Sequence, residues 1–380
     1  MQLSFWEQQS FFSNLDVVII GSGIVGLNAA ICLKEKNPAL KVLIVERGFL
    51  PYGASTRNAG FACFGSVSEL LDDLSIESEQ EVFSRVEKRW KGLLRLRNLL
   101  GDENINYEGN GGYEVFSEDE KELFEQCADK ISYFNKHLKS ITGEDETYSL
   151  QNNKIKEFGF GKINNLLFNK CEGQIDTGKM MQALLNLAYK LGVQILNGIE
   201  IKTIQSSKEN VELITDKEFS FQTKKLLICN NGFAKQLMPE LNVEPARAQV
   251  LITSPIENLK LKGTFHFQKG YYYFRNVGDR VLFGGGRNLN IAGETTTAFG
   301  LTEQIQQSLD SYLKEIILPY TNYTVEQRWS GIMGIGKSKS TIIKKIEPNV
   351  YCAVRMGGMG IAIGSLVGQQ AAEMVLEIGS

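Results

Sequence analysis

The first 46 residues contain the pattern that most constrains the fold. Residues 16–20 are a short apolar run rich in Val and Ile, typical of a strand buried on both faces. A glycine-rich turn at 21–26, a helical pattern at 27–36 and a second apolar strand at 41–45 follow, and Glu46 ends the unit. This order predicts a Rossmann-type βαβ unit that binds a dinucleotide.

Each part of this unit has a physical task. Gly21 allows the tight turn, Gly23 lets a pyrophosphate approach the backbone, and Gly26 allows helix and strand to pack closely. Glu46 would accept hydrogen bonds from a ribose diol and would repel a 2′-phosphate. A G-x-G-x-x-G sequence alone is often only a glycine-rich turn, so the prediction depends on the flanking strands, helix and acid. The unit does not distinguish between dinucleotides.

Length and composition narrow the alternatives. With 380 residues the chain predicts two domains, and its net charge of −3 gives no reason to expect nucleic acid or an anionic membrane as partner. The six cysteines are scattered without a C-x-x-C pair, which predicts buried, reduced thiols; we expect no metal site. Residues 1–12 lack a basic start and glycines interrupt the apolar stretch 17–33, so we expect a cytoplasmic protein without membrane insertion.

The rest of the chain alternates between helical and strand patterns. Helical periodicity covers residues 68–100, 118–138, 179–189, 301–318 and 361–376, and strands are expected at 113–116, 193–196, 225–229 and 350–354 and, in antiparallel order, between 247 and 287. The loop at 47–61 is rich in glycine and small polar residues. It is either functional or a solvated surface loop.

A second glycine-rich turn, residues 357–360, lies between the last strand and the last helix. Such a helix N-terminus presents bare backbone amides that can stabilise an anion or partial negative charge. Gly360, Gly364 and Gly368 are spaced four apart. Because the helix is short and ends in polar residues, this spacing predicts close packing against protein rather than a membrane dimer motif.

Six motifs follow one another from end to end of the chain: Gly-Ser-Gly-Ile-Val-Gly at 21–26, Glu-Arg-Gly at 46–48, Gly-Ala-Ser-Thr-Arg-Asn-Ala-Gly at 53–60, Leu-Ile-Cys-Asn-Asn-Gly-Phe at 227–233, Arg-Trp-Ser-Gly at 328–331 and Gly-Gly-Met-Gly-Ile at 357–361. Together they resemble the FAD-dependent D-amino acid oxidase-like family, which includes glycine and sarcosine oxidases. The loop at 53–60 and the Arg-Trp-Ser-Gly segment look most like its gamma-glutamylputrescine oxidase branch.

The resemblance implies an α/β fold (α+β overall) with a Rossmann-like FAD-binding domain and a second, mixed β-sheet substrate domain. The expected FAD-binding domain comprises residues 1–67, 170–246 and 326–380, and the expected substrate domain 68–169 and 247–325. The resemblance also implies an FAD-dependent oxidoreductase that takes a hydride from the carbon beside an amine nitrogen to flavin N5, giving an imine that water hydrolyses. The two histidines, His137 and His266, leave little room for a Ser-His-Asp hydrolase.

The expected partners are a small-molecule amine or amino acid and O2 or another electron acceptor. The residues expected to bind the cofactor by this resemblance are Gly21, Ser22, Gly23, Ile24, Val25, Gly26, Glu46, Arg47, Ser55, Thr56, Arg57, Asn58, Ala59, Gly60, Ile201, Asn230, Asn231, Gly232, Gly331, Gly357, Gly358, Met359, Gly360 and Ile361. The substrate-site candidates are Arg57, Asn58, Tyr271, Tyr273, Arg287 and Met333.

Alternatives remain open for several of these candidates. Tyr271 and Tyr273 alternate onto one face of a strand, where they either contact substrate or are ordinary sheet aromatics. Arg287 follows three glycines at a strand end, where it either approaches a ligand or forms a surface ion pair.

The sequence departs from the family at two places. Met333 and Ala362 stand where several members carry a basic residue for the substrate carboxylate, and Arg57, Arg275 or Arg287 would have to replace it. Residues 332–336 lack the cysteine that attaches FAD covalently in some members, so we expect non-covalent FAD. Alternative functions are the FAD-dependent oxidation of a 2-hydroxy acid and a non-catalytic flavin-binding subunit.

Overall fold

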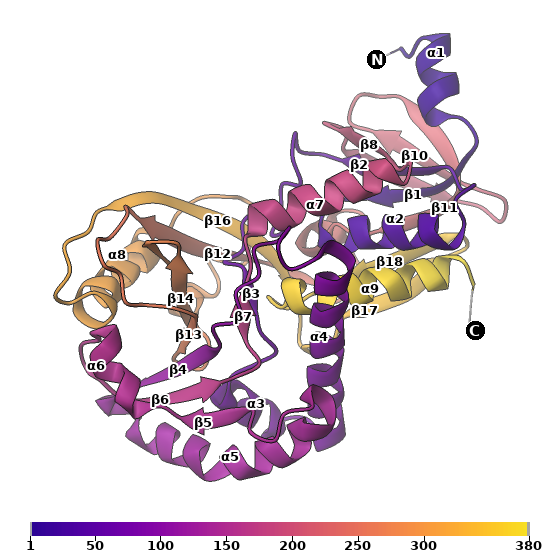
Figure 1. Ribbon diagram of the computed structural model, residues 1–380. Helices are drawn as coiled ribbons and strands as arrows, with labels where there is room; N and C mark the ends of the chain where they lie inside the picture. Colours follow the sequence, from indigo (N-terminus) through magenta and orange to yellow (C-terminus); the bar gives the residue numbers. More distant parts are fainter. Residues whose placement is uncertain (1, 378–380) are drawn as a thin grey trace.

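The computed structural model describes residues 2–377. Residue 1, the start of the expected segment 1–67, and residues 378–380, the end of the expected segment 326–380, lie outside the described part. The described chain forms two large β-sheets joined by helices and short connections (Figure 1). This arrangement confirms the predicted combination of a Rossmann-like sheet and a second mixed sheet.

The first sheet has β1 (Leu15–Ile20) at its centre, with parallel neighbours on both sides. Its main order is β17 (Ile342–Glu347), β18 (Val350–Val354), β11 (Ser220–Ile228), β1, β2 (Val42–Glu46) and β8 (Gln194–Asn197). The apolar run of β1 is buried on both faces, as the sequence predicts, because its alternating side chains enter two separate cores.

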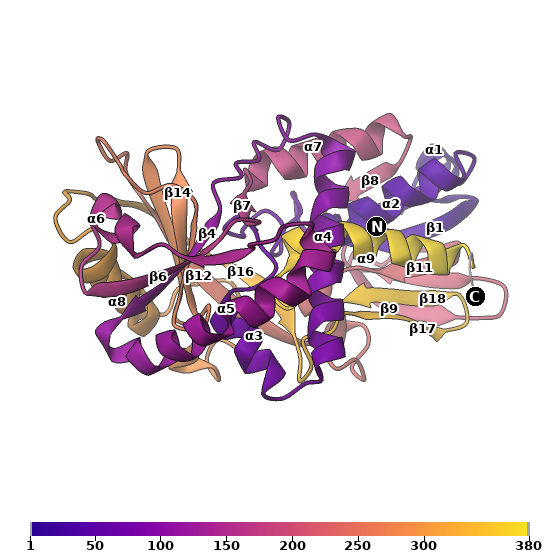
Figure 2. The same ribbon diagram turned by 60° about the horizontal axis from the view of Figure 1, so that its bottom comes forward.

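Helices cover one face of this sheet: α2 (Ile24–Lys36), α4 (Glu79–Leu100), α7 (Thr177–Lys190) and α9 (Gly360–Val375). In both ribbon views α2 and α9 lie side by side, and α4 stands between the two sheets (Figures 1 and 2). A Cβ at Gly368 would lie 2.6 Å from the Cβ of Asn28 and 2.8 Å from the carbonyl oxygen of Val25. The prediction that the glycines of α9 allow close packing against protein is therefore confirmed.

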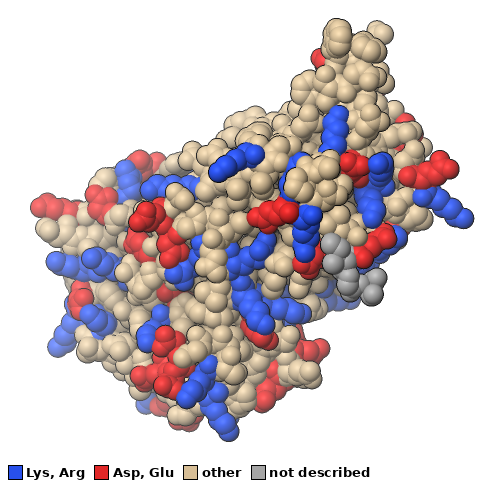
Figure 3. All heavy atoms as spheres, turned by 45° about the vertical axis from the view of Figure 1, so that its right-hand side comes forward, with Lys and Arg blue, Asp and Glu red and all other residues tan. Residues whose placement is uncertain are grey.

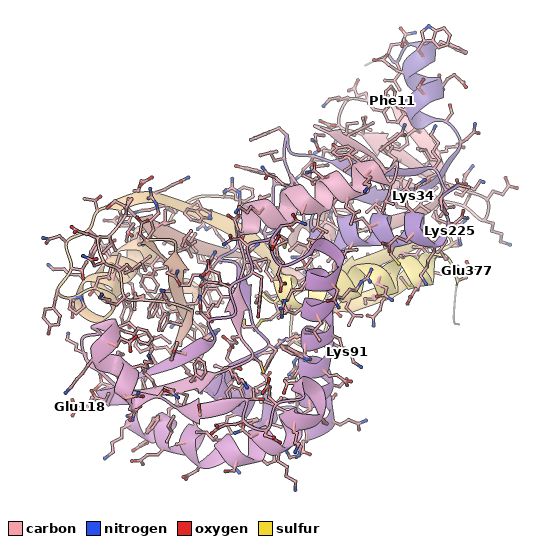
Figure 4. The ribbon with its side chains drawn as sticks, in the orientation of Figure 1. Phe11, Lys34, Lys91, Glu118, Lys225 and Glu377 are labelled. Carbon is pink, nitrogen blue, oxygen red and sulfur yellow. The ribbon has the colours of Figure 1, made fainter. Side chains whose placement is uncertain are left out.

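The opposite face is covered by β9 (Ile201–Ser206) and β10 (Val211–Thr215), which pair antiparallel with each other, while β10 also pairs with β11. A short N-terminal helical segment, α1 (Phe5–Glu7) and η1 (Gln8–Phe12), projects away from this domain; Figure 4 labels Phe11 on it. Phe12 anchors the segment through ring contacts with Phe219 and Phe221.

The second sheet has eight strands in the order β16 (Val325–Ile335), β12 (Glu244–Thr253), β15 (Arg280–Gly285), β14 (Tyr272–Val277), β13 (Thr264–Phe267), β4 (Gly112–Ser117), β6 (Ile163–Asn169) and β5 (Tyr148–Leu150). The expected antiparallel strands and the hairpin turn at Gly278 are confirmed. The boundary strands β12 and β16 pair with each other along their whole length, so both belong to this sheet.

The outer face of the second sheet packs against α8 (Glu303–Tyr312) and η6 (Leu313–Ile317) through an aromatic core that includes Phe265 and Phe274. At the β5–β6 end of the sheet α3 (Val67–Leu74) and α5 (Lys121–Thr142) share a core with Tyr148 and Leu167. The short α6 (Ile155–Phe158) joins the aromatic core through Phe158, and β3 (Phe61–Ala62) pairs with β7 (Gly173–Gln174).

One expected helix is divided in the structure. The helical pattern at 68–100 corresponds to α3 and α4 rather than to a continuous helix. The Ser78 hydroxyl accepts a hydrogen bond from the backbone N–H of Glu81, and the Glu81 carboxylate accepts one from the N–H of Ser78. This capping box starts a new helix within a stretch whose apolar spacing continues.

Within residues 2–377, no helix is both long and apolar enough to cross a lipid bilayer. Lysine and arginine side chains are interspersed with aspartate and glutamate over the face shown in Figure 3. On that face neither sign of charge forms a continuous field.

Candidate functional site

The first glycine turn connects β1 to α2 at the carboxyl edge of the first sheet. Gly21 has a φ of +102°, a conformation that favours glycine, and Gly23 occupies the N-cap position of α2. The Ser55 hydroxyl accepts a hydrogen bond from the backbone N–H of Ile24 at 3.1 Å. A Cβ on Gly23 would lie 2.8 Å from this hydroxyl, so a side chain at position 23 would displace Ser55 and crowd the helix N-terminus that can receive an anion.

Glu46 ends β2 beside this turn and is buried. One of its carboxylate oxygens accepts hydrogen bonds from the backbone N–H and the hydroxyl of Ser22, both at 3.1 Å. The other accepts from the backbone N–H of Gly48 at 3.0 Å. The carboxylate is thus fixed next to the anion site, where an adenosine ribose would lie.

A cavity of about 360 Å³ extends from this turn along the edge of the sheet. The cofactor candidates that line it are Gly21, Gly23, Glu46, Arg47, Ser55, Ile201, Asn230 and Asn231. The side-chain oxygen of Asn230 is buried and has no hydrogen-bond partner among the described residues. An enclosed, unpartnered acceptor in a cavity with a helix N-terminus fits a ligand that carries both anionic and hydrogen-donating groups.

The loop after Glu46 is tightly folded. Arg47 stacks on the ring of Phe233, 3.7 Å from its centroid. The Arg57 guanidinium lies over the rings of Tyr52 and Phe299 and donates a hydrogen bond to the Ser330 carbonyl at 2.9 Å. The loop is therefore held against the second sheet rather than solvated.

Asn58 fixes the end of this loop. Its amide donates to the carbonyls of Ala54 and Ser55, and its oxygen accepts from the N–H of Gly60 and the hydroxyl of Thr177. Thr56 donates to the Pro51 carbonyl, and Ala59 accepts from the Arg275 guanidinium. These contacts show that Arg57 and Asn58 hold the loop in place. A contact of either residue with substrate stays a prediction.

The second glycine turn lies between β18 and α9. Gly357 and Gly358 have φ values of +58° and +82°, and α9 begins at Gly360 without a side-chain cap. The Asn231 side-chain oxygen accepts hydrogen bonds from the backbone N–H groups of Arg355 and Met356, which ties this turn to the first cavity.

Strand β16 brings further candidates to the same turn. A Cβ on Gly232 would lie 2.4 Å from the Met333 carbonyl, and one on Gly358 would lie 3.5 Å from the Met333 sulfur. Gly331 faces the Cβ of Arg57, 3.2 Å from the position a Cβ would occupy. Asn231 and Met333, from two distant segments, therefore meet the turn at 357–361, and Gly331 brings Arg57 next to the same strand.

The other candidates occupy different positions. Ser22, Ile24, Val25 and Gly26 are buried in or next to the first turn of α2 and do not line the cavity, and Ile361 is buried in α9. Tyr271 is exposed, whereas Tyr273 is half-buried and faces Phe61. Burial raises the pKa of Tyr273 to about 12, which keeps its hydroxyl neutral.

Arg287 lies directly after the left-handed Gly286 and is half-buried. Its Nε is buried without a hydrogen-bond partner among the described residues, and burial lowers the pKa of the guanidinium. It forms none of the ion pairs found in the described part of the chain.

Two features of the site escaped the sequence reasoning. The far wall of the cavity comes from Ile199, Glu200, Lys202 and Leu237, which carry no motif. A buried pair, Glu172 and His266, lies on the inner side of the second sheet with 2.9 Å between carboxylate and imidazole. The two residues are 94 positions apart, so no local pattern indicates their contact.

Comparison with known proteins identifies the family. Residues 16–374 match the family described as FAD dependent oxidoreductase (DAO). The chain is 23% identical over 385 residues to the probable oxidoreductase OrdL of Haemophilus influenzae, covering 95% of this chain and 83% of that protein. It is 26% identical over 239 residues to the bifunctional protein ThiO/ThiG of Synechocystis sp., covering 62% of this chain and 32% of that protein. The chain thus spans about a third of this second relative.

Among solved structures, glycine oxidase from Bacillus cereus superposes with a TM-score of 0.75 at 21% identity, covering 97% of this chain and 96% of that one. At this identity the similarity shows a common fold. The family match, by contrast, extends over nearly the whole chain, and the family is defined by its dependence on FAD. The protein belongs to the FAD dependent oxidoreductase family, and its cofactor is FAD.

Proposed function

We propose that this oxidoreductase oxidises the C–N bond of an amine or amino acid. The substrate carbon loses a hydride and the nitrogen loses a proton, and water hydrolyses the resulting imine to a carbonyl compound and an amine or ammonia. Bound FAD supplies the two-electron acceptor at flavin N5. The single observation that carries this proposal is the meeting of two helix N-termini, those of α2 and α9, at one edge of the first sheet.

The residues around the first cavity fit the adenosine and pyrophosphate. Gly23 and the N-terminus of α2 would hold the pyrophosphate, because Gly23 has no Cβ to fill the approach; the N–H of Gly21 already donates to the Val45 carbonyl and that of Ile24 to the Ser55 hydroxyl. Glu46 would accept hydrogen bonds from the ribose diol, and Ile201 lies on the apolar wall where adenine would pack. Asn230 would receive the hydrogen bond that its buried oxygen lacks.

The second turn fits the flavin ring. The uncapped amides at the start of α9 are oriented so that they stabilise negative charge that develops on the flavin during reduction. Gly357, Gly358 and Met359 leave the backbone accessible there, and Met333 and Tyr273 would face the substrate. This chemistry needs a neutral amine held over the ring, and Tyr273 keeps its hydroxyl neutral because burial raises its pKa to about 12.

FAD is expected to bind without a covalent bond to protein. All six cysteines are buried and free, and none occurs within residues 332–336. Boiling the yellow protein should therefore release the flavin to the supernatant. Flavin that stays with the precipitated protein after boiling would contradict this expectation.

The substrate class is tested by mixing the purified yellow protein with panels of amines, amino acids and 2-hydroxy acids without oxygen. Bleaching of the flavin by amines or amino acids alone supports the proposal. Bleaching by hydroxy acids alone would replace it with C–O oxidation. Admitting air afterwards distinguishes an oxidase, whose colour returns, from a dehydrogenase that needs another acceptor.

A further inference from the structure

The inner face of the second sheet, which meets the loop at 47–60, carries one cross-strand row of side chains. Residues directly opposite each other on neighbouring strands point to the same face. Trp329, at one end of the row, donates a hydrogen bond from its indole N–H to the Arg57 carbonyl at 3.0 Å. This face is therefore the one toward the loop at 47–60, called the cofactor loop below. The row consists of Glu114 in β4, His266 in β13, Tyr273 in β14, Gly284 in β15, Val250 in β12 and Trp329 in β16.

Next to Glu114, at the other end of the row, His266 is paired with Glu172. The imidazole Nε2 lies 2.9 Å from a carboxylate oxygen of Glu172, and the two side chains are 7% and 1% exposed. That oxygen also accepts a hydrogen bond from the Thr264 hydroxyl at 3.0 Å, and the other accepts from the Asn169 amide at 3.2 Å. A Cβ on Gly112 would lie 1.9 Å from the carboxylate, so the neighbouring strand leaves space for this pair.

The charges around His266 favour its protonated form. Glu172 from the β6–β7 connection, Glu114 from β4 and Glu69 from α3 all face it, while burial opposes its charge. The attraction of the three carboxylates outweighs the effect of burial, so the pKa of His266 is raised to about 9. Cys63 lies nearby, and burial raises the pKa of its thiol, so it adds no charge.

His266 and Tyr273 hold the same ring between them. Phe61, the first residue of β3, makes edge-to-face contacts with His266 at 5.4 Å and with Tyr273 at 5.6 Å between ring centroids. Its backbone pairs with Gln174 of β7, two residues after Glu172. Phe61 also follows Gly60, the last residue of the cofactor loop. The buried pair therefore reaches Phe61 both through the imidazole and through β7.

We propose that His266, held by Glu172, is a positioning residue for the reaction: it fixes Phe61 and Tyr273 as the wall on the substrate side of the flavin. An imidazolium against an aromatic ring is attracted to the ring's π-system, so its loss frees Phe61 to rotate. This proposal rests on the proposed function, because it assigns the two rings to the substrate side of the cofactor.

A metal ion is the competing explanation of the cluster. Cys63, Glu172 and His266 each place a potential ligand atom within 4.8 Å of the others. The carboxylate oxygen that would bind an ion already accepts hydrogen bonds from His266 and Thr264, so protein donors satisfy it. We expect purified holoenzyme to contain no stoichiometric metal at this cluster. A metal that is lost in H266Q would overturn the positioning role.

The first test measures the limiting rate of flavin reduction in oxygen-free rapid mixing, with the substrate that bleaches the wild-type flavin. H266Q, E172Q and F61L should each lower this rate about tenfold with FAD content unchanged, as expected when a positioning contact is lost. The double variant H266Q/F61L should be no slower than the slower single variant, because each change alone already removes the same contact between His266 and the Phe61 ring. If H266Q does not fold, E172Q and F61L provide the same comparison.

The matched control is H137Q, which replaces the other histidine of the chain. His137 also lies beside a glutamate, Glu79 at 3.2 Å, but on the surface between α4 and α5. Its reduction rate should equal that of the wild type. A rate of H266Q within twofold of wild type, or multiplying effects of H266Q and F61L, would overturn the proposal. If the wild-type flavin is bleached by no amine at all, the proposed function fails instead.

A second measurement is independent of activity. Because the chain has only two histidines, nitrogen NMR of ¹⁵N-histidine-labelled protein shows two imidazoles, and H137Q assigns them. His266 should remain protonated at pH 8 in the wild type and become neutral in E172Q. A neutral His266 in the wild type would remove the charged contact on which the proposal depends.

Discussion

Gly23 shows how a single missing side chain defines the cofactor site. A Cβ there would crowd the Ser55 hydroxyl at 2.8 Å and fill the path of a pyrophosphate to the α2 amides. Gly23→Ala should weaken FAD binding at least tenfold, measured by flavin fluorescence during titration of flavin-free protein, because close approach to a helix N-terminus is lost. Gly109→Ala is the control, since its Cβ would make only an ordinary contact at 3.4 Å. Equal affinities in both variants would exclude this position of the pyrophosphate.

We predict that Arg287, whose buried Nε has no hydrogen-bond partner among the described residues, binds a substrate carboxylate. Charge-assisted hydrogen bonds contribute about 1.5–3 kcal/mol, so Arg287→Gln should raise KM for carboxylate-bearing amines roughly 10–100-fold. Arg280→Gln, at the other end of β15 and paired with Glu326, is the control and should leave KM unchanged. An amine without a carboxylate should be oxidised equally by all three proteins. A fall in kcat alone would argue against carboxylate binding.

At the scale of elements, the contact between α2 and α9 aligns the two helix N-termini. Gly364 and Gly368 allow this contact, because a Cβ at either position would lie within 3 Å of atoms in α2. Gly368→Val should destabilise the protein by about 3 kcal/mol through overpacking, measured as the free energy of unfolding in urea. Gln370→Ala, a half-buried position on the same helix, should change it by less than about 0.5 kcal/mol. Equal stability of the two variants would mean that α9 shifts freely on α2.

Loop 47–60 is the element that joins the two sheets at the site. Arg57 stacks between Tyr52 of the loop and Phe299 of the second sheet's long connection, and Trp329 caps the Arg57 carbonyl. From the sequence alone this loop is either a functional loop or a solvated surface loop. Its contacts show why a loop of this length is ordered: its polar groups are satisfied from both sheets.

At the scale of the whole molecule, two buried acid–base groups link stability to pH. Burial raises the pKa of Glu114 from its ordinary 4.5 to about 7, and the surrounding acids raise that of His266 from 6.5 to about 9. Both folded-state values lie above the unfolded ones, so their stabilisation is complete below the unfolded pKa and is lost as pH rises. The free energy of unfolding should therefore fall between pH 4.5 and 9, by at most about 3 kcal/mol per group.

Glu114→Gln isolates the acidic half of this dependence. Between pH 5 and 7 its unfolding free energy should change less than that of the wild type, because the only group removed is the carboxyl that titrates there. Glu118→Gln, at an exposed site labelled in Figure 4, should keep the wild-type slope. A slope in Glu114→Gln equal to that of the wild type would show that other groups cause the dependence.

The sequence by itself determined the first βαβ unit, the second glycine turn, the family and FAD. These features depend on the local backbone, and the positions of glycines and the spacing of apolar residues reveal them within short stretches of sequence. The division of helix 68–100 also has a local signal, the Ser78–Glu81 capping box, although the apolar spacing obscured it. Only the tertiary structure decided the far wall of the cavity, the stacking of Arg57 on Phe299 and the pairing of Glu172 with His266. These contacts join residues many positions apart that the folded chain brings together. No short-range pattern in the sequence carries that information.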